Sequence, residues 1–242
     1  MGAAPPALSR RGAFTVGQTA RMATWLVTGA NRGIGLELVR QLHARGETVV
    51  ATCRASTPEL DAVGCRVVEG IDVGSDDVGP ALDAALDPDE RIDVIVNNAG
   101  VGGGDSVDRV DFDLARRQYD VNTLGPLRVV LALLPRLDRG ANIGFVSSKA
   151  GSIGDRPSGG SYGYRMSKSA LNMGAANLAH ELAPRGILVA VLHPGFVRTE
   201  MTHGGGNVDP PEAAAGLIAR LDELDEATSG RFVHANGDAI PW

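Results

Sequence analysis

The sequence predicts a doubly wound α/β fold, a single domain whose central, mostly seven-stranded parallel sheet is flanked by helices on both faces. Short apolar, β-branched runs alternate along the chain with segments of helical periodicity. The runs are apolar at nearly every position, as expected for strands buried on both faces. A glycine-rich turn joins the first strand to the first helix. With 242 residues and no repeat or linker, the chain has the length of one such domain.

Each element follows from this alternation. The first strand lies between Ala23 and the turn at Gly29, and apolar residues with helical spacing follow it from Ile34 to Leu42. Six further strands are expected at Thr48–Cys53, Arg66–Glu69, Asp93–Val96, Asn142–Ser147, Ile187–His193 and Arg231–His234. Further helices are expected near 76–86, at Phe112–Leu137 with a break at Gly125-Pro126, at Tyr164–Leu182 and at Pro211–Leu224. Right-handed crossovers would bring the strand ends to one edge of the sheet.

Composition excludes several classes of function. The net charge of −6 argues against a general affinity for nucleic acid, and no apolar run is long enough to span a membrane. Cys53 and Cys65 lack metal-ligand spacing, so we interpret them as reduced core thiols rather than a disulfide or zinc site. We therefore expect no metal and a cytoplasmic location.

The first residues are rich in Ala, Gly, Pro and Arg and lack the apolar core of a secretory signal. We expect a disordered extension over residues 1–22 and the folded domain over residues 23–242. Because Met22 immediately precedes the first strand, one hypothesis is that it is the true start of the protein.

The glycine turn has the features of a phosphate site. Gly29 would allow the tight turn, Gly33 would leave room for a phosphate against the backbone, and Gly35 would let the helix pack closely on the strand. Exposed amide groups at the start of the helix would then hold a pyrophosphate. The spacing GxxxGxG is also compatible with an ordinary strand-to-helix turn.

Tyr164 and Lys168 lie four residues apart on an expected helix, so their side chains share a face. An ammonium ~4 Å from the phenol, at an effective dielectric of ~20, contributes about 4 kcal/mol. That is enough to lower a phenol pKa from ~10 to about 7, where the phenol transfers protons at neutral pH. The same spacing is common in exposed helical pairs. Tyr162 is a less suitable candidate because Met166, four residues on, cannot tune it.

Six motifs occur in a fixed order over residues 23–242: Thr28–Gly35, Asn97–Gly100, Asn122, Ser147-Ser148, Tyr164 with Lys168, and Pro194-Gly195. This order resembles the short-chain dehydrogenase/reductase family, which has a Rossmann-type fold. Three further segments are similar to the branch of C-factor and sniffer-type carbonyl reductases: Gly160–Asn172, Leu192–Met201 and Gly230–Trp242. The loop between Ser148 and Tyr164 is about three residues longer than is usual in the family, a lengthening that this branch shares.

The resemblance implies a catalytic role for four residues. Tyr164 would donate a proton to a carbonyl oxygen while hydride arrives from the nicotinamide, and Lys168 would lower the pKa of Tyr164 and bind the ribose. Ser148 would orient the same oxygen, although Ser147 is a rival and either hydroxyl could simply end a strand. Asn122 would hold a water that relays protons, or would bond its own helix backbone.

The resemblance also implies the cofactor contacts. Asn98, Ala99 and Gly100 would line the adenosine side, and Asp72 would reach the adenine amine, unless it is a plain turn residue. The other cofactor contacts, besides the three glycines, Tyr164 and Lys168, would be Asn31, Arg32, Ile34, Arg54, Val73, Pro194, Gly195, Val197 and Thr199.

Charge predicts NADP(H) rather than NAD(H). An acidic residue at the end of the second strand would bind the ribose 2′-hydroxyl of NAD, but here the strand ends in Cys53-Arg54. Arg54, and Arg32 in the glycine turn, could pair with a 2′-phosphate instead. Alternatively, both arginines are solvated surface groups and the preference is weak.

These features together predict an NADP(H)-dependent oxidoreductase, a carbonyl reductase or alcohol dehydrogenase that acts on a small-molecule carbonyl or alcohol substrate. The short, glycine-rich stretch Thr199–Asp209 favours a small, mobile lid and an open site. The family resemblance also implies a homodimer or homotetramer. The alternative is a C-factor-like signalling or sensor protein that binds a nucleotide and whose catalysis is incidental.

Overall fold

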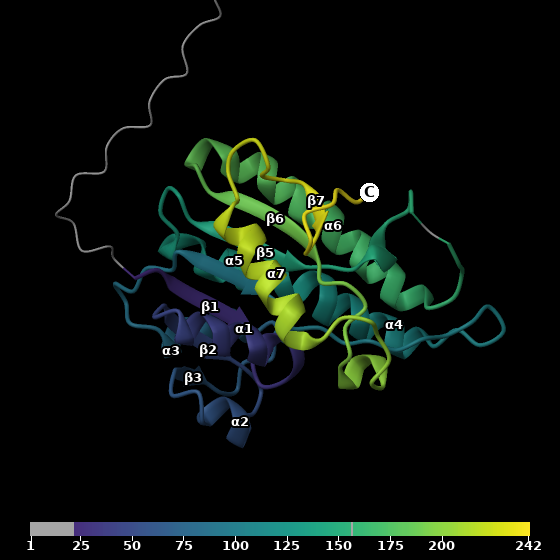
Figure 1. The fold of residues 1–242 in the computed structure, drawn as a ribbon, viewed down its shortest axis with the longest axis horizontal. Helices are drawn as coiled ribbons and strands as arrows, with labels where there is room; N and C mark the ends of the chain where they lie inside the picture. The colour runs from purple at the N-terminus through teal and green to yellow at the C-terminus, as the bar shows by residue number, and fades with distance from the viewer. Residues whose placement is uncertain (1–21, 156) are drawn as a thin grey trace, which may run out of the picture.

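A seven-stranded, all-parallel sheet forms the centre of the computed structural model, which describes residues 22–155 and 157–242 (Figure 1). The strand order is β3-β2-β1-β4-β5-β6-β7. The strands are β1 (Thr24–Thr28), β2 (Thr48–Thr52), β3 (Arg66–Val68), β4 (Val94–Asn97), β5 (Asn142–Val146), β6 (Leu188–His193) and β7 (Phe232–His234). The predicted doubly wound fold is therefore confirmed. The expected extension lies outside the described residues, apart from Met22.

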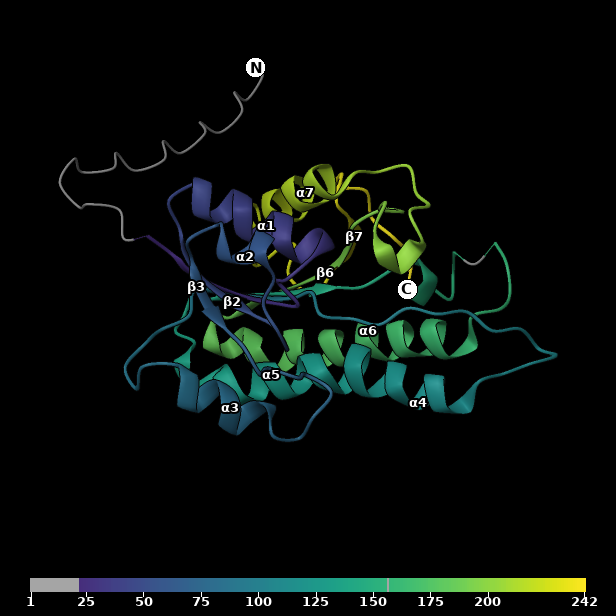
Figure 2. The same ribbon diagram turned by 90° about the horizontal axis from the view of Figure 1, so that it is seen from below.

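Helices cover both faces of the sheet, as the crossover rule requires (Figure 2). The short α2 (Pro58–Asp61) follows β2 and was not expected from the sequence. The helices α1 (Gly33–Ala44) and α7 (Pro210–Asp222) lie on one face. The other face carries α3 (Val78–Ala85), α4 (Phe112–Tyr119), α5 (Gly125–Leu133) and α6 (Tyr162–Leu182).

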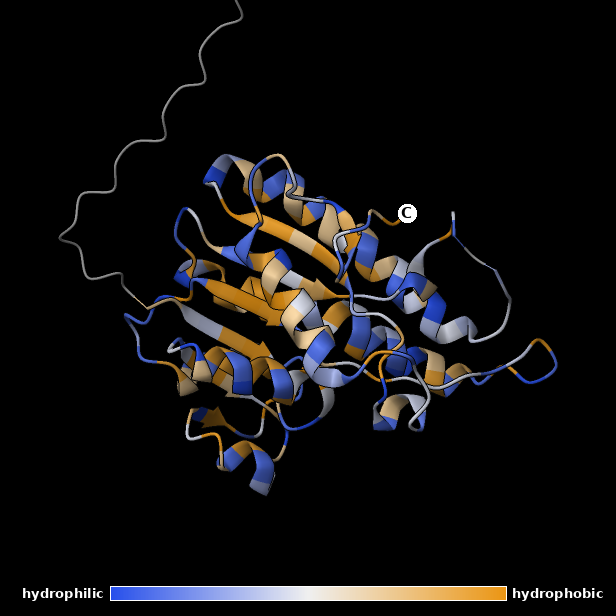
Figure 3. Ribbon diagram, viewed as in Figure 1, coloured by the Kyte–Doolittle hydropathy of each residue, from blue (hydrophilic) through white to orange (hydrophobic). Residues whose placement is uncertain are grey.

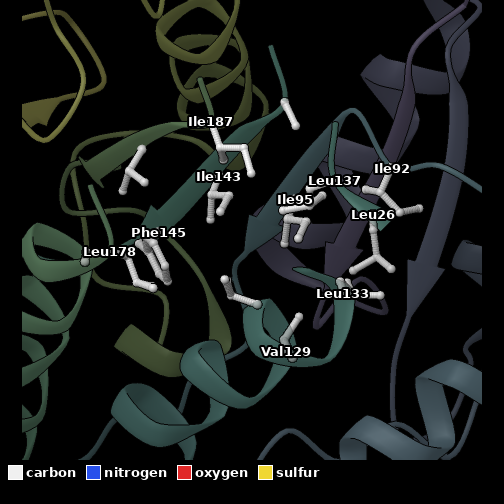
Figure 4. Close-up of a cluster of buried hydrophobic side chains, with 14 of the residues drawn as sticks. Leu26, Ile92, Ile95, Val129, Leu133, Leu137, Ile143, Phe145, Leu178 and Ile187 are labelled. Carbon is white, nitrogen blue, oxygen red and sulfur yellow. The ribbon is translucent and has the colours of Figure 1, made fainter. Parts of the chain in front are cut away.

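Two apolar cores result, one on each face of the sheet. Successive strand residues point to opposite faces, so Leu26 joins the core under α3, α5 and α6 while Trp25 and Val27 join the core under α1 and α7. The strands are accordingly almost uniformly apolar in Figure 3, and Figure 4 shows Leu26, Ile143 and Phe145 in the first of these cores. No helix in the described part of the chain is long and apolar enough to cross a membrane.

The strand order creates a crevice at the carboxyl edge of the sheet. The chain moves outward from β1 to β3 and then returns to place β4 on the other side of β1. The connections therefore leave β1 and β4 in opposite directions, which is the topological switch point where open α/β sheets bind ligands.

The segment Phe112–Leu137 differs from the single interrupted helix that we expected. Contrary to our expectation, Gly125-Pro126 does not interrupt the helical segment but forms the first turn of α5. The irregularity lies just before it, where Asp120–Leu124 form a π-helical turn and the Gly125 amide donates to the Asp120 carbonyl. Pro126 has no N–H, so the carbonyl of Asn122 cannot accept the usual bond from the residue four positions on. The π-helical turn places Asn122 in the interior, with no exposed surface.

Candidate active site

A cleft of about 700 Å³ opens at the switch point, along the carboxyl ends of β1, β2, β4 and β5. Most of the predicted cofactor residues border it: Gly29, Asn31, Arg32, Gly33, Ile34, Gly35, Arg54, Asp72, Val73, Asn98, Ala99, Gly100, Tyr164, Lys168, Pro194 and Thr199. The structure thus gathers at one cleft residues that are up to 170 positions apart in the sequence. Asn122, Ser148, Gly195 and Val197 do not border the cleft directly.

The glycine turn after β1 is shaped by close backbone contacts. Gly29 and Gly33 have φ angles of +65° and +55°, which favour glycine. A Cβ on Gly35 would lie only 2.2 Å from the carbonyl oxygen of Gly29, so the helix start packs directly on the turn. No side chain of the described residues caps the N-terminus of α1. Its free amides are therefore available to an anion such as a pyrophosphate, and the turn fits a dinucleotide.

Substituting Gly35 by alanine is expected to destabilise the fold by about 3 kcal/mol, since the new methyl group must push the helix off the turn. Urea unfolding measures this difference. Gly159→Ala is the matched control, because no atom of the described residues lies within 4 Å of a Cβ at Gly159. Equal stabilities of the two variants would contradict the close packing.

Two asparagines hold the loops around the cleft. Asn98 donates its side-chain amide to the carbonyls of Thr28 (2.9 Å) and Gly29 (3.1 Å), which ties the end of β4 to the glycine turn. Asn31 donates to the Ala55 carbonyl at 3.1 Å and so connects the same turn to the segment that carries Arg54. These side chains shape the cleft wall, in addition to the cofactor contact predicted for them.

The Tyr164 hydroxyl is hydrogen-bonded to the side chain of Ser148. Ser147 borders the cleft, but its hydroxyl turns into the interior and donates to Asn172 Oδ1 at 2.6 Å. Of the two serines, the geometry thus favours Ser148 as the partner of Tyr164. Ser148 also accepts the Ala150 amide at 3.1 Å and begins the 3₁₀ turn Lys149–Gly151.

Lys168 lies one helical turn beyond Tyr164 and is only 5% exposed. Its ammonium donates to the Val146 carbonyl at 2.9 Å. Burial lowers the pKa of Lys168 to about 8.

The Tyr164 pKa is raised, not lowered by Lys168 as we expected from the sequence. Burial raises the pKa of Tyr164, and the opposing contact is the hydrogen bond from Ser148. The physical reason is that burial removes the phenolate from water and so disfavours the charged form, a cost that an argument from the neighbouring charge alone leaves out.

The Asn122 side chain fixes the loop after β4. Its oxygen accepts the Val101 amide at 2.8 Å, and its amide donates to the Val101 carbonyl at 2.9 Å and to Ser167 Oγ at 3.0 Å. A Cβ on Gly100 would lie 3.2 Å from the Asn122 oxygen, so this loop passes close to the asparagine. The side chain therefore binds the β4 loop rather than its own helix, and the proton relay stays a prediction.

Arg32, Arg54 and Asp72, three charged residues predicted to contact the cofactor, differ in their partners within the protein. Arg54 is exposed at the cleft and forms no ion pair with any described residue. Arg32 instead pairs with Glu200 across the mouth of the cleft. Asp72 accepts the Gly74 amide at 2.9 Å, as a turn aspartate does, while still bordering the cleft. Arg54 is thus the better placed of the two arginines for a 2′-phosphate.

The glycine-rich stretch after β6 is folded back on itself. Glu200–Thr202 form a 3₁₀ turn, the Arg198 amide donates to the Val208 carbonyl at 2.9 Å, and the Arg198 side chain pairs with Asp209 at 2.7 Å. Val197 is buried at the base of this fold, which explains its absence from the cleft wall. The mobility of this lid stays a prediction.

Sequence reasoning missed several residues at the site. Arg117 and Met201 border the cleft, and Ser167 binds both the Asn122 amide and the Tyr164 carbonyl. Ser167 could have been found from its spacing, because it lies three residues after Tyr164 on the same helix. Arg117 and Met201 carry no such signal, since only the tertiary fold brings them to the cleft.

Three features occur together here: a glycine turn at the switch point of a doubly wound sheet, a tyrosine and a buried lysine at the same cleft, and a serine hydrogen-bonded to that tyrosine. They define the class of dinucleotide-dependent dehydrogenases and reductases. Comparisons with known proteins agree with this class. A family described as short chain dehydrogenase matches residues 23–207. The chain belongs to the short-chain dehydrogenase/reductase family and is an oxidoreductase.

Three similar proteins place it further. The 1-hydroxy-2-glutathionyl-2-methyl-3-butene dehydrogenase of a Rhodococcus species is 45% identical, over 91% of this chain and 100% of that protein. The C-signal protein of Myxococcus xanthus is 40% identical, over 62% of this chain and 93% of that protein. The structure of NADPH-bound carbonyl reductase from chicken fatty liver aligns with a TM-score of 0.81 and 30% identity, covering 92% of this chain and 100% of that one. The expected likeness to C-factor and carbonyl reductases is confirmed.

Proposed function

We propose that this protein is an NADP(H)-dependent carbonyl reductase or alcohol dehydrogenase. The observation that carries the proposal is that Tyr164, which borders the same cleft as Lys168 and the glycine turn, is hydrogen-bonded to Ser148. A carbonyl oxygen that accepts hydrogen bonds from both hydroxyls would be oriented and protonated at one place. NADP(H), when bound, supplies the hydride from C4 of its nicotinamide.

The residues of the chain then handle the proton. Because its pKa is raised, the Tyr164 phenol stays neutral at physiological pH, which is the form that donates a proton to a carbonyl oxygen during reduction. Ser148 holds that oxygen by a second hydrogen bond. In the oxidative direction Tyr164 would act as the base, and its raised pKa disfavours that direction near neutral pH.

Arg54→Ala is expected to raise the Kd of NADPH by about 10- to 100-fold, because a charge-assisted contact to the 2′-phosphate is lost. NADH, which lacks that phosphate, should bind as before. Quenching of protein fluorescence by each nucleotide measures both constants.

Arg40→Ala is the matched control for this experiment. It removes the same charge from an arginine that pairs with Glu37 at 2.6 Å and does not border the cleft. An unchanged ratio of NADPH to NADH affinity in Arg54→Ala would show that Arg54 is only a solvated surface group.

The catalytic set favours an enzyme over a nucleotide-bound signalling protein. A sensor would need the glycine turn, but it would not need a tyrosine and a buried lysine at the same cleft together with a serine hydrogen-bonded to the tyrosine. The C-signal protein of M. xanthus belongs to the same family, but this likeness does not distinguish an enzyme from a signalling protein. Tight NADPH binding without turnover of any substrate class would favour the signalling role.

A substrate panel tests the proposed function. Aldehydes, quinones, diketones and a glutathionyl alcohol would be offered with NADPH or NADP⁺, and nicotinamide absorbance followed. The last compound is included because of the substrate named for the Rhodococcus relative. We expect turnover of at least one class, and Ser148→Ala should lower kcat by about 10²-fold.

The homodimer or homotetramer and the cytoplasmic location expected from the sequence remain predictions. Five large hydrophobic side chains of the described residues are exposed on α4 and α6, which pack against each other: Phe112, Tyr119, Tyr162, Met166 and Met173. A homodimer or homotetramer through these helices would cover them, as would be expected for an interface. The acidic net charge of −6 supports the expectation that nucleic acid is not a partner.

A further inference from the structure

The 3₁₀ turn that begins at Ser148 is clamped against helix α6. The Gly151 carbonyl accepts the Ser169 hydroxyl at 2.9 Å. A Cβ on Gly151 would lie 2.7 Å from the carbonyl carbon of Lys168, so the turn lies directly on the helix that carries Tyr164 and Lys168. The Gly151 amide in turn donates to the Ser148 carbonyl at 2.8 Å. Whatever fixes the far end of this turn therefore also fixes Ser148.

The far end of the turn is held by the last residues of the sequence. Ser152 is 2% exposed, and its hydroxyl donates to the Pro241 carbonyl at 2.5 Å. The amides of Ile153 and Gly154 both donate to the main-chain oxygen of Trp242, at 3.0 and 2.7 Å. The Ser152 hydroxyl also lies 3.4 Å from the Trp242 oxygen, so four bonds join residues 241–242 to the loop that follows Ser148, about 90 positions earlier in the sequence.

The tail itself is firmly attached to the sheet. Ile240 donates its amide to the Phe232 carbonyl of β7 at 2.9 Å, and Val233 forms a bridge with Ala239. The rings of Phe232 and Trp242 lie 5.6 Å apart, and Phe232 is buried. The end of the chain, marked C, accordingly lies beside the sheet and α6 in Figure 2. The contact with the loop is therefore supported by β7.

Gly154 is adapted to this contact. A Cβ at that position would lie 3.2 Å from both the Pro241 Cβ and the Trp242 oxygen, tighter than most such contacts. The Asp155 amide donates back to Ser152 Oγ at 2.9 Å, and Asp155 pairs with Lys149 at 2.8 Å. The loop from Ser148 to Asp155 is therefore held together by its own contacts, and it packs against residues 241–242.

We propose that residues 241–242 are a positioning element for catalysis, which holds the Ser148 hydroxyl in register with Tyr164 through the turn Lys149–Gly151 and Ser152. The tail does not touch the Tyr164–Ser148 pair in this arrangement; it acts through Ser148. The proposal rests on the catalytic role proposed above for Ser148. Its consequence is that loss of the tail misplaces one hydroxyl and leaves the cofactor cleft unchanged.

A double-mutant cycle tests this proposal. The variants are the chain ending at Ile240, Ser148→Ala, and the two changes combined, with kcat and KM for the carbonyl substrate and Kd for NADPH measured on each. Truncation alone should lower kcat by about tenfold and change the Kd of NADPH less than about twofold, since the loss concerns transition-state contacts only. In the Ser148→Ala background the same truncation should lower kcat less than about twofold further.

The outcomes separate the two proposals. An unimpaired Ser148→Ala enzyme would overturn the catalytic role itself. If Ser148→Ala is impaired but truncation has no effect on kcat, or lowers kcat equally in both backgrounds, the positioning role is wrong and the tail serves stability alone.

A milder variant covers the case in which the truncated chain does not fold. Ser152→Ala removes only the hydroxyl that binds Pro241, and it should show the same loss of kcat and the same dependence on Ser148. Ser158→Ala is the control, because Ser158 lies in the same loop and its hydroxyl accepts from Arg165 at 3.0 Å instead of contacting the tail. Equal kcat values for Ser152→Ala and Ser158→Ala would overturn the proposal.

Discussion

Tyr164→Phe is expected to lower kcat for carbonyl reduction by about 10³-fold, because general acid catalysis by the phenol is lost. The Kd of NADPH should stay within about twofold, since the substitution removes a single oxygen and leaves the half-buried ring in place. Steady-state kinetics and a separate nucleotide-binding titration measure the two effects.

Tyr162→Phe is the matched control for this experiment. Tyr162 lies on the same helix two residues earlier, is exposed, and does not border the cleft. It should retain full activity. Comparable activity of Tyr164→Phe and the wild type would remove the general acid from the mechanism, whereas loss in both variants would point to the helix rather than to the hydroxyl.

Lys168→Met is expected to lower kcat by about 10²-fold, since it removes a buried positive charge that lies one helical turn from the proton donor. It should also change how stability depends on pH. The folded protein binds the lysine proton with a pKa of about 8, whereas the ordinary value is 10.5.

The sign of this dependence follows from proton linkage. Between about pH 8 and 10.5 the unfolded chain keeps a proton that folded Lys168 has lost, so the free energy of unfolding rises with pH over that window. Below pH 8 folded Lys168 is protonated, so the full free-energy cost of burying its charge lowers the stability of the folded protein. Lys168→Met should lack this rise, as unfolding by urea at a series of pH values would show.

Lys149→Met is the matched control for this experiment, because Lys149 is the other lysine of the chain and its side chain is 49% exposed. It should keep the wild-type pH dependence. Parallel stability curves for wild type and Lys168→Met would mean that Lys168 titrates as an ordinary solvated lysine.

The sequence was sufficient to predict the fold because its strands are buried on both faces. Leu26 and Val27 are both fully buried although they point to opposite faces, and a continuous apolar run such as theirs indicates a parallel sheet. The π-helical turn at Asn122 was not predictable in the same way. A proline signals that a helix is disturbed, but tertiary packing decides whether the helix breaks there or widens.

The site was predictable where its residues lie in local motifs. Tyr164 and Lys168 share a helix, and the glycines share a turn, so spacing alone brings them together. The ion pair of Arg32 with Glu200 and the contact of Ser152 with Pro241 join segments separated by 168 and 89 positions. The direction of the Tyr164 pKa also depended on burial, because a pairwise estimate of charge effects omits desolvation.

The central claim is that Tyr164 and NADP(H) deliver a proton and a hydride to one carbonyl group. Reduction of an accepted carbonyl substrate with NADPH deuterated at C4 tests it most directly, with the product analysed by mass spectrometry. Deuterium should appear on the carbinol carbon of the product with the wild type, and product should be nearly absent with Tyr164→Phe although NADPH still binds. Product without deuterium, or undiminished labelled product from Tyr164→Phe, would contradict the claim.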